Sequence, residues 1–329
     1  MATPRALRTL ASLPAVETLV RTVAGILPRR RDSLAVLTFH RVASGPSVVP
    51  GLHSATPESF RRLLDLLGES FRIIPLQDAL ARAAGGPTLP PRSLLLTFDD
   101  GYADLAAEAW PALQERDLPA VAFIPTAFPD GAIGSFWWER AYAAILAATT
   151  DGLEMDGRTF RLQTLDDRRA TWRQLRDGFK GMPNDEIAGR VDVLERALGI
   201  DPADQPEPSG RSLTWPELVR LRDEGLALAS HTRTHPLLTQ VSRARAEAEV
   251  RGGIEDLERQ VGATPSAFAY PAGAHDPTVV DIVREAGVRL AFTTRPGTND
   301  LRDVDWLRLR RFNVGVGTPR AAILARALR

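Results

Sequence analysis

The chain of 329 residues contains no cysteine. It can therefore form neither a disulfide nor a thiolate metal site, and any metal ion must be held by histidine, aspartate or glutamate. For the same reason, cysteine usage does not indicate the compartment in which the protein works.

The sequence also lacks an excess of charge of either sign, because 41 Lys and Arg residues balance 41 Asp and Glu residues. No global field favours nucleic acid or an anionic surface. We therefore expect no nucleic-acid partner, and a neutral small molecule or glycan as the ligand. The proportions of hydrophobic and charged residues are those of a globular protein.

A long hydrophobic run is missing as well. The N-terminal apolar stretch at residues 16–27 is interrupted by Glu17 and Arg21, so it is too short and too charged for a transmembrane segment and lacks a clear signal-peptide core. We expect residues 1–31 to form a solvated amphipathic arm, with peripheral membrane contact as the alternative. The expected location is the cytoplasm or the membrane surface.

From residue 33 onward, apolar runs typical of strands alternate with helical patterns. Such alternation predicts a parallel sheet, and about eight strands suit a (β/α) barrel, whose active site lies at the carboxyl ends of the strands. The expected strands are residues 33–39, 71–75, 93–96, 119–125, 226–230, 266–270, 288–293 and 307–314.

One segment, residues 128–213, breaks this alternation. Its first expected helix begins with the aromatic triplet Phe-Trp-Trp at residues 136–138, and such triplets more often pack an insertion onto its host than bind a ligand. We interpret the segment as a helical insertion within a barrel domain of residues 32–329. Because it leaves from the carboxyl end of a strand, we expect it to form one wall of the substrate groove. Its expected helices are residues 136–149, 166–180 and 184–198, followed by a Pro-rich linker at 201–209.

Two adjacent carboxylates, Asp99 and Asp100, follow the strand at residues 93–96, in the run Thr-Phe-Asp-Asp-Gly. Like charges side by side and partly buried raise one pKa unless a cation or a donor compensates, so the pair is a candidate for metal binding and general-base work. The alternative is an ordinary Asp-Asp-Gly turn.

Two histidines follow the strand at residues 226–230. His231 and His235 are four residues apart, and Pro236 disfavours a helix at His235, so we expect a loop. One carboxylate and two imidazoles would hold a divalent metal ion and leave open positions for water. A third strand end carries Phe-Ala-Tyr-Pro-Ala-Gly at residues 268–273, which on its own would be a structural turn.

With these motifs, the sequence resembles the polysaccharide deacetylases of carbohydrate esterase family 4, the chitooligosaccharide deacetylase homology domain. The resemblance covers most of residues 33–314 apart from the insertion, and it rests on pairing Thr-Phe-Asp-Asp-Gly with Ser-His-Thr-x-x-His-Pro. It implies a distorted (β/α)7 barrel that removes acetyl groups from sugars with one divalent metal ion.

The resemblance also implies roles for individual residues. Asp99 matches the catalytic base, and Thr232 the hydroxyl residue that steadies the histidine loop. In the third motif, which includes Tyr270 and Pro271, the backbone N–H of Ala272 would bind the oxyanion. The residues that match the metal ligands are Asp100, His231 and His235.

Two departures from the family pattern stand out. Ala269 replaces the arginine that often pairs with the base, and no histidine follows His275 to serve as the usual general acid. The run Leu-Thr-Phe-His-Arg-Val at 37–42 resembles the opening motif of biofilm poly-N-acetylglucosamine deacetylases, which implies His40 as the acid, unless it is a structural histidine. Leu-Arg-Arg-Phe at 309–312 resembles an element of exopolysaccharide deacetylases, which implies Arg311 as the missing guanidinium.

The resulting expectation is a metal-dependent hydrolase, acting on carbon–nitrogen bonds other than peptide bonds, that deacetylates an N-acetylated poly- or oligosaccharide. The expected cofactor is Zn²⁺, with Co²⁺ or Ni²⁺ as alternatives. Two other functions stay open from the sequence. Two histidines and a carboxylate also form the facial triad of non-heme Fe(II) oxygenases, and the missing arginine would suit a catalytically silent glycan-binding protein.

Overall fold

The computed structural model describes residues 32–129, 131, 134–201, 209–262 and 266–328. The amphipathic arm expected at residues 1–31 lies outside these residues and stays a prediction. None of the described helices is long and apolar enough to cross a membrane.

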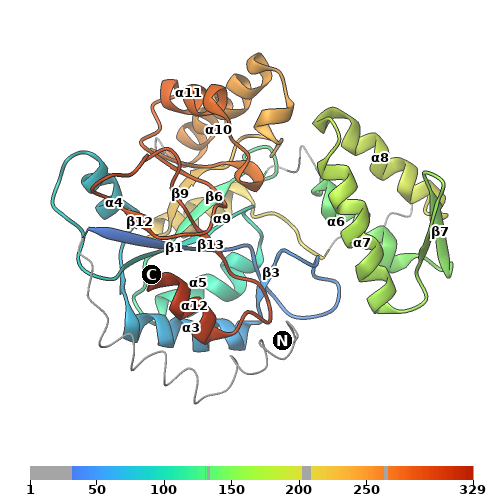
Figure 1. The fold of residues 1–329 in the computed structure, drawn as a ribbon, viewed down its shortest axis with the longest axis horizontal. Helices are drawn as coiled ribbons and strands as arrows, with labels where there is room; N and C mark the ends of the chain where they lie inside the picture. The colour runs from blue at the N-terminus through green and yellow to red at the C-terminus, as the bar shows by residue number, and fades with distance from the viewer. Residues whose placement is uncertain (1–31, 130, 132–133, 202–208, 263–265, 329) are drawn as a thin grey trace.

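A curled, mostly parallel sheet forms the centre of the molecule (Figure 1). Its strands are hydrogen-bonded in the order β11, β10, β9, β6, β5, β1, so strands that follow one another along the chain mostly lie side by side. The principal strands are β1 (Ser33–Phe39), β5 (Ser93–Phe98), β6 (Val121–Ile124), β9 (Ala227–Ser230), β10 (Ala267–Ala269) and β11 (Leu290–Phe292). Shorter strands are β2 (Arg41–Val42), β3 (His53–Ala55), β4 (Arg72–Ile73), β12 (Asn299–Asp300) and β13 (Phe312–Asn313).

The segment before α12 closes the barrel. Leu309 pairs in parallel with Phe292 of β11, and a few residues later β13 pairs in parallel with β1. One stretch of chain thus joins the strands at the two ends of the parallel sheet. The fold is a distorted (β/α) barrel, which confirms the predicted fold class.

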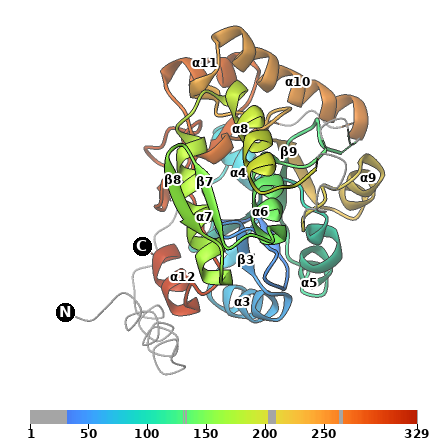
Figure 2. The same cartoon turned by 90° about the vertical axis from the view of Figure 1, so that its right-hand side faces the viewer.

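Helices surround the barrel on its outside (Figures 1 and 2). Their ends follow local sequence signals: Thr56 caps the first long helix by accepting a hydrogen bond from Ser59 N, and Pro57 occupies its first turn. The helices are α3 (Pro57–Ser70), α4 (Leu76–Ala83), η1 (Leu105–Ala109), α5 (Trp110–Gln114), α9 (Trp215–Asp223), η3 (Leu238–Gln240), α10 (Arg243–Val261), η4 (Pro271–Gly273), α11 (Pro277–Glu285) and α12 (Arg320–Ala327).

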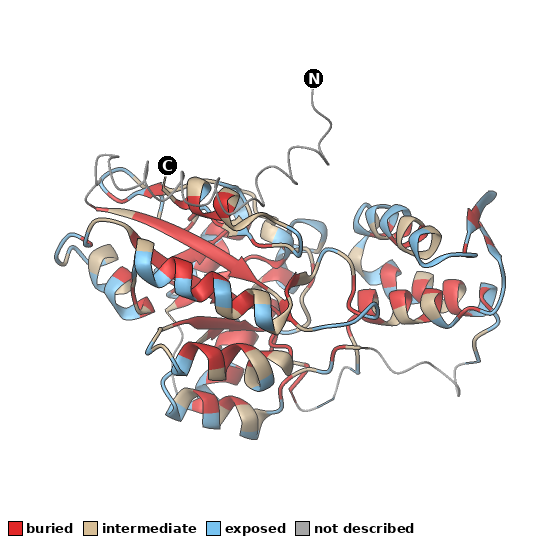
Figure 3. Ribbon diagram, turned by 90° about the horizontal axis from the view of Figure 1, so that it is seen from below, coloured by how far each residue is buried: buried red, intermediate tan, exposed pale blue. Residues whose placement is uncertain are grey.

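The strands are buried on both faces, as their continuous apolar runs predict. Along β1, Leu34 and Val36 belong to the cluster that fills the barrel, whereas Leu37 and Phe39 belong to the cluster under the outer helices. Figure 3 shows the strands buried through the middle of this body, with exposed residues on the outer faces of the helices. Such two-sided burial makes the strand ends a rigid rim for functional side chains.

A separate helical lobe lies beside the barrel (Figures 1 and 2). It consists of α6 (Trp137–Ala147), α7 (Leu165–Lys180) and α8 (Asn184–Ala197), together with a hairpin of β7 (Gly152–Met155) and β8 (Arg158–Arg161). The helices occur close to where the sequence predicts them, but the hairpin was missed. Its Asp-Gly turn at residues 156–157 is a strong hairpin signal that the surrounding helical patterns obscured.

Buried polar contacts attach the lobe to the barrel. Arg41 Nε donates to Asp104 Oδ2 (2.6 Å), and Arg41 Nη1 lies 3.4 Å from Glu139 Oε1 at the start of α6. Trp138 Nε1 donates to the hydroxyl of Tyr102 (2.8 Å). The aromatic residues thus pack the insertion onto its host, and they also bring α6 beside the strand ends.

Candidate active site

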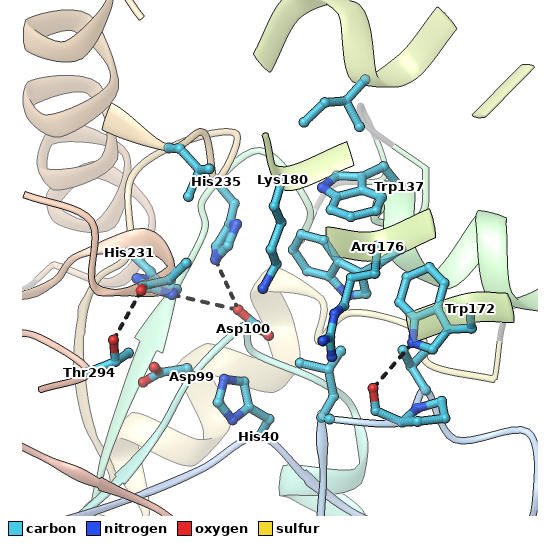
Figure 4. A pocket seen from close by; sticks show the side chains of 18 of the residues that line it. His40, Asp99, Asp100, Trp137, Trp172, Arg176, Lys180, His231, His235 and Thr294 are labelled. Atoms are coloured by element: carbon cyan, nitrogen blue, oxygen red, sulfur yellow. Dashed lines mark hydrogen bonds and ion pairs between the residues drawn. The ribbon is translucent and has the colours of Figure 1, made fainter. Parts of the chain in front are cut away.

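A cavity lies between the strand ends and the helical lobe (Figure 4). It encloses about 800 Å³ of empty space, including the open solvent at its mouth. The predicted site residues that line it are His40, Asp99, Asp100, His231, His235 and Ala272. They come from the ends of β1, β5, β9 and β10, which are far apart in sequence.

Asp99 is held by an arginine from the closing segment of the barrel. Arg311 Nη1 and Nη2 each donate to one oxygen of the Asp99 carboxylate at 2.8 Å, and Arg311 Nε donates to Thr293 O (2.9 Å). The guanidinium is fully buried and lies over the rings of Phe123 and Phe292. Although Ala269 stands where the family often has arginine, Arg311 thus pairs with the expected base.

This pairing decides the charge of Asp99. Burial alone would raise the pKa of the carboxyl group, but the charge and hydrogen bonds of Arg311 outweigh burial and lower the pKa of Asp99 to about 2. Asp99 therefore stays ionised and fixed in orientation at neutral pH.

Asp100 has the opposite environment. Its Oδ1 is buried and has no hydrogen-bond partner within the described residues, and it lies 3.6 Å from His231 Nε2 and 3.4 Å from His235 Nε2. Burial, together with the neighbouring charge of Asp99, raises the pKa of Asp100 well above its usual value. An ionised carboxylate here lacks the donors or cation that buried charges require.

The two histidines present nitrogen lone pairs to the same point. The contact of His231 Nδ1 with Ala269 O (2.7 Å) makes Nδ1 the donor, which leaves Nε2 as the acceptor that faces Asp100. Burial lowers the pKa of both His231 and His235, so both rings are neutral near pH 7. Two neutral imidazoles around an unpartnered carboxylate oxygen are a donor set that fits a zinc-type divalent cation.

Strained backbone gathers at this site. Four of the eight described non-glycine residues with positive φ lie in it, namely Asp100 (73°), Thr232 (70°), His235 (59°) and Ala272 (51°). Such conformations persist only where the surroundings enforce them, and they are often found at functional sites. Here they turn the chain sharply at three strand ends, so that Asp100, His235 and Ala272 line one cavity and Thr232 supports the histidine loop behind it.

Side chains behind the histidine loop hold its shape. Thr232 Oγ1 accepts a hydrogen bond from His235 N (3.0 Å), which places the threonine where the resemblance expects it. Glu249, a buried residue of α10, accepts hydrogen bonds from the backbone N–H groups of Arg233 (3.1 Å) and Thr234 (2.8 Å). The loop is therefore anchored to a helix on the outside of the barrel.

His40 follows β1 and lines the cavity beside Asp99 (Figure 4). Its backbone N–H donates to Ser54 Oγ (2.9 Å), and its ring faces the carboxylates. Burial lowers the pKa of His40 to about 4, although Asp99 partly opposes this effect. The ring is neutral near pH 7 and can donate a proton only after it has taken one up. His53 and His275, by contrast, contact the backbone oxygens of Ala43 and Gly273 away from the cavity.

Only part of the third motif, residues 268–273, lies at the cavity. Ala272 lines it, but Tyr270 and Pro271 lie outside the residues that line it. The Tyr270 hydroxyl donates instead to Leu307 O (2.9 Å) in the wall of the barrel. Thr294 Oγ1 donates to Ala272 O (3.1 Å), which fixes the left-handed turn of Ala272.

The lobe forms a wall of the cavity, as expected for the insertion, but the sequence did not identify the residues that line this wall. Trp137, Trp172, Arg176 and Lys180 line the cavity opposite the strand ends (Figure 4). Spacing gave no indication of these residues, because helical periodicity predicts a face but not which cavity it covers. One compositional signal was available: Lys180 is the single lysine among the 41 basic residues of the chain.

Comparison with known proteins gives a family and a shared fold. Residues 86–291, more than half of the chain, match the model of the family described as polysaccharide deacetylase. No curated protein matches the chain.

Among solved structures, the deacetylase PplD of Streptococcus pyogenes, in complex with acetate, is 16% identical, with a TM-score of 0.59 over 91% of this chain and 99% of that chain. IcaB from Ammonifex degensii is 20% identical (TM-score 0.57; 91% and 98%). The BpsB deacetylase domain from Bordetella bronchiseptica is also 20% identical (TM-score 0.55; 88% and 98%). At these identities the likeness shows a shared fold.

Proposed function

Because the chain belongs to the polysaccharide deacetylase family, we propose that its cavity removes acetyl groups from N-acetylated sugars of a poly- or oligosaccharide with the help of a divalent metal ion. One observation carries the proposal. The unpartnered oxygen of Asp100 and two neutral imidazoles converge beside a second carboxylate, Asp99, that an arginine keeps ionised.

In this proposal Asp100, His231 and His235 hold the ion, with Zn²⁺ as the cofactor and Co²⁺ or Ni²⁺ as alternatives. When bound, a divalent cation polarises the acetyl carbonyl group and lowers the pKa of a water molecule. Asp99 is the general base, and Arg311 orients its carboxylate. The Ala272 N–H donates to the carbonyl oxygen as that oxygen gains negative charge.

The leaving amine needs a proton, and His40 is the residue we propose for this step. It is the only histidine besides the metal-site pair among the residues that line the cavity in the described part of the chain. Its low pKa makes the protonated ring a strong acid, which favours transfer to an amine. The lobe, with Trp137 and Trp172, would form the opposite wall against which a sugar ring packs.

The two alternatives fit the geometry less well. A non-heme iron oxygenase uses one carboxylate and two histidines and has no role for a second carboxylate held by an arginine. A catalytically silent glycan-binding protein was suggested by the missing arginine, but Arg311 supplies a guanidinium to Asp99 from the closing segment of the barrel. Deacetylation therefore accounts for more of the buried polar groups.

Acetate release from N-acetylglucosamine oligosaccharides tests the proposal, with the purified protein loaded with Zn²⁺, Co²⁺ or Ni²⁺. We expect release by the wild type and none by Asp99→Asn, which retains the metal site. His231→Ala should lose both metal and activity. A metal-loaded wild type that binds these sugars without releasing acetate would establish the silent alternative instead.

A further inference from the structure

Lys180 stands apart from every other basic residue of the protein. It is the only lysine, whereas the other 40 basic residues are arginines. Only Arg176 and Lys180 among the basic residues line the cavity within the described residues. A chain that uses arginine everywhere else thus has its one ammonium group beside the residues of the proposed metal site. An ammonium group is a compact charge on a flexible stem, whereas a guanidinium is planar, so the two bind anions differently.

The lobe and the barrel both fix the position of Lys180. It is the last residue of α7, it follows the buried Phe179 of the lobe core, and its backbone oxygen accepts a hydrogen bond from Gln240 Nε2 (3.0 Å) in the chain after His235. Its side chain runs from the lobe down into the cavity toward Asp100 (Figure 4). The ammonium group is therefore presented to whatever occupies the cavity.

The carboxylates near Lys180 already have other binding partners. The carboxylates that line the cavity are Asp99, which is bonded to Arg311, and Asp100, which belongs to the metal site. Within the described residues, no carboxylate lies within ion-pair distance of the Lys180 ammonium group. Arg176, one turn earlier, is bonded to the exposed Asp177 at the cavity rim.

With a dication in the metal site, the cavity carries a net positive charge, although the whole chain has none. We propose that Lys180, supported by Arg176, forms a subsite for a negatively charged group of the saccharide, a carboxylate or a phosphate, next to the N-acetylated sugar. Charge-assisted hydrogen bonds from the ammonium group would select such substrates. This inference rests on the proposed function, and it narrows the substrate from a neutral glycan to an anionic one.

Binding can be followed separately from acetate release, in the first mixing phase before turnover, because Trp137 and Trp172 line the same cavity and report on its occupant by fluorescence. Three probes separate the possibilities: neutral di-N-acetylchitobiose, a hyaluronan tetrasaccharide with uronate carboxylates, and N-acetylglucosamine 1-phosphate. We expect the zinc-loaded wild type to bind at least one anionic probe about 10- to 100-fold more tightly than the neutral one, the range for a hydrogen bond to a charged group. The preferred anionic probe identifies carboxylate or phosphate as the recognised group.

Variants assign the effect to the lysine. Lys180→Ala should abolish the preference and leave binding of the neutral probe within a factor of about two, whereas Lys180→Arg should keep part of it. Arg173→Ala removes an exposed cation from the same helix and is the matched control, which should leave the binding of all three probes unchanged. Zinc content and melting temperature, compared across the variants, confirm that the fold is intact.

The outcomes separate this inference from the proposed function. Equal binding of neutral and anionic probes by the wild type, or an equal loss of all three in Lys180→Ala, overturns the subsite even if acetate is released. An anionic preference that depends on Lys180, in a protein that never releases acetate, retains the subsite and rejects deacetylation.

Discussion

At the residue scale, the Asp99–Arg311 pair shows why position in space matters more than position in a motif. The guanidinium comes from the end of the chain rather than from position 269, yet it reaches the carboxylate with two hydrogen bonds of 2.8 Å. Both groups are buried, so neither can be replaced alone without leaving an uncompensated charge inside the barrel.

Arg311→Met should therefore destabilise the protein by about 3–5 kcal/mol, the usual effect of removing one partner of a buried ion pair. The double variant Asp99→Asn/Arg311→Met should recover most of this loss, because it removes both charges. Chemical denaturation of the three proteins at pH 7 measures the difference. If the single and double variants are equally unstable, packing rather than charge explains the role of Arg311.

The same pair predicts how the stability of the folded protein depends on pH. The pKa of Asp99 is about 2 in the folded protein and about 4 when unfolded. A group with a lowered folded pKa contributes stability above its unfolded pKa, and that contribution is lost as the pH falls from about 4 to about 2. In Arg311→Met, burial becomes the main influence on Asp99 and raises its pKa against the weaker effects of His231 and His40, so the dependence should reverse and acid should stabilise the variant.

His40 allows a test that separates acid catalysis from structure. His40→Ala should keep its metal content and melting temperature but lower kcat for amide substrates by about 10²- to 10⁴-fold, the range for loss of general acid–base assistance. An aryl acetate has a leaving group that needs no proton, so its hydrolysis should be nearly unaffected. A parallel loss on both substrates would place His40 in positioning rather than in proton transfer.

At the scale of elements, helix α10 holds the proposed metal site from outside the barrel. Glu249 accepts hydrogen bonds from Arg233 N and Thr234 N, and the hydroxyl of Thr234 donates to its other oxygen (2.5 Å). Asp256, further along the same helix, accepts from Thr126 Oγ1 (2.8 Å). The helix thus determines the turn that presents His231 and His235.

Glu249→Ala should lower the affinity for Zn²⁺ by about 10- to 100-fold, as is typical when a group that supports metal ligands is lost. Glu247→Ala is the matched control, because Glu247 lies on the exposed side of the same helix and pairs with Arg243. Competition against a chelator of known affinity measures the zinc affinities of both variants. Equal zinc affinities for the two variants would show that the loop keeps its shape without Glu249.

At the scale of the whole molecule, the barrel and the clustering of Asp100, His231 and His235 were predictable from the sequence because they depend on local signals. Buried strands read as apolar runs, and motifs such as Thr-Phe-Asp-Asp-Gly follow them directly. The placement of Arg311 came from a resemblance, and only barrel closure brings it to Asp99. The sequence predicted that the insertion would form a wall, but not that Trp172 and Lys180 would line it, because the lining residues depend on how the lobe docks, which long-range contacts decide.

The proposed metal site would also couple function to the stability of the whole chain. In the metal-free protein Asp100 has a raised pKa, so it favours folding at low pH, and this contribution is lost as the pH rises through the folded pKa. Binding of a cation offsets this loss of stability at higher pH. A ligand at 100 times its dissociation constant stabilises the folded state by about 2.7 kcal/mol. Protons compete for the same ligands, so metal occupancy should fall in acid.

Asp100→Asn should therefore melt at a higher temperature than the wild type when both are measured in chelator near pH 7, because it removes an uncompensated buried charge. The difference should shrink as the pH falls and the wild-type carboxyl group becomes protonated. Added Zn²⁺ should raise the melting temperature of the wild type but not that of the variant.

Asp99→Asn provides the contrast: it leaves the buried Arg311 unpaired, so it should melt lower than the wild type under the same conditions. Calorimetry of the three proteins, with chelator and with zinc, decides whether Asp100 is kept for the metal at the expense of stability.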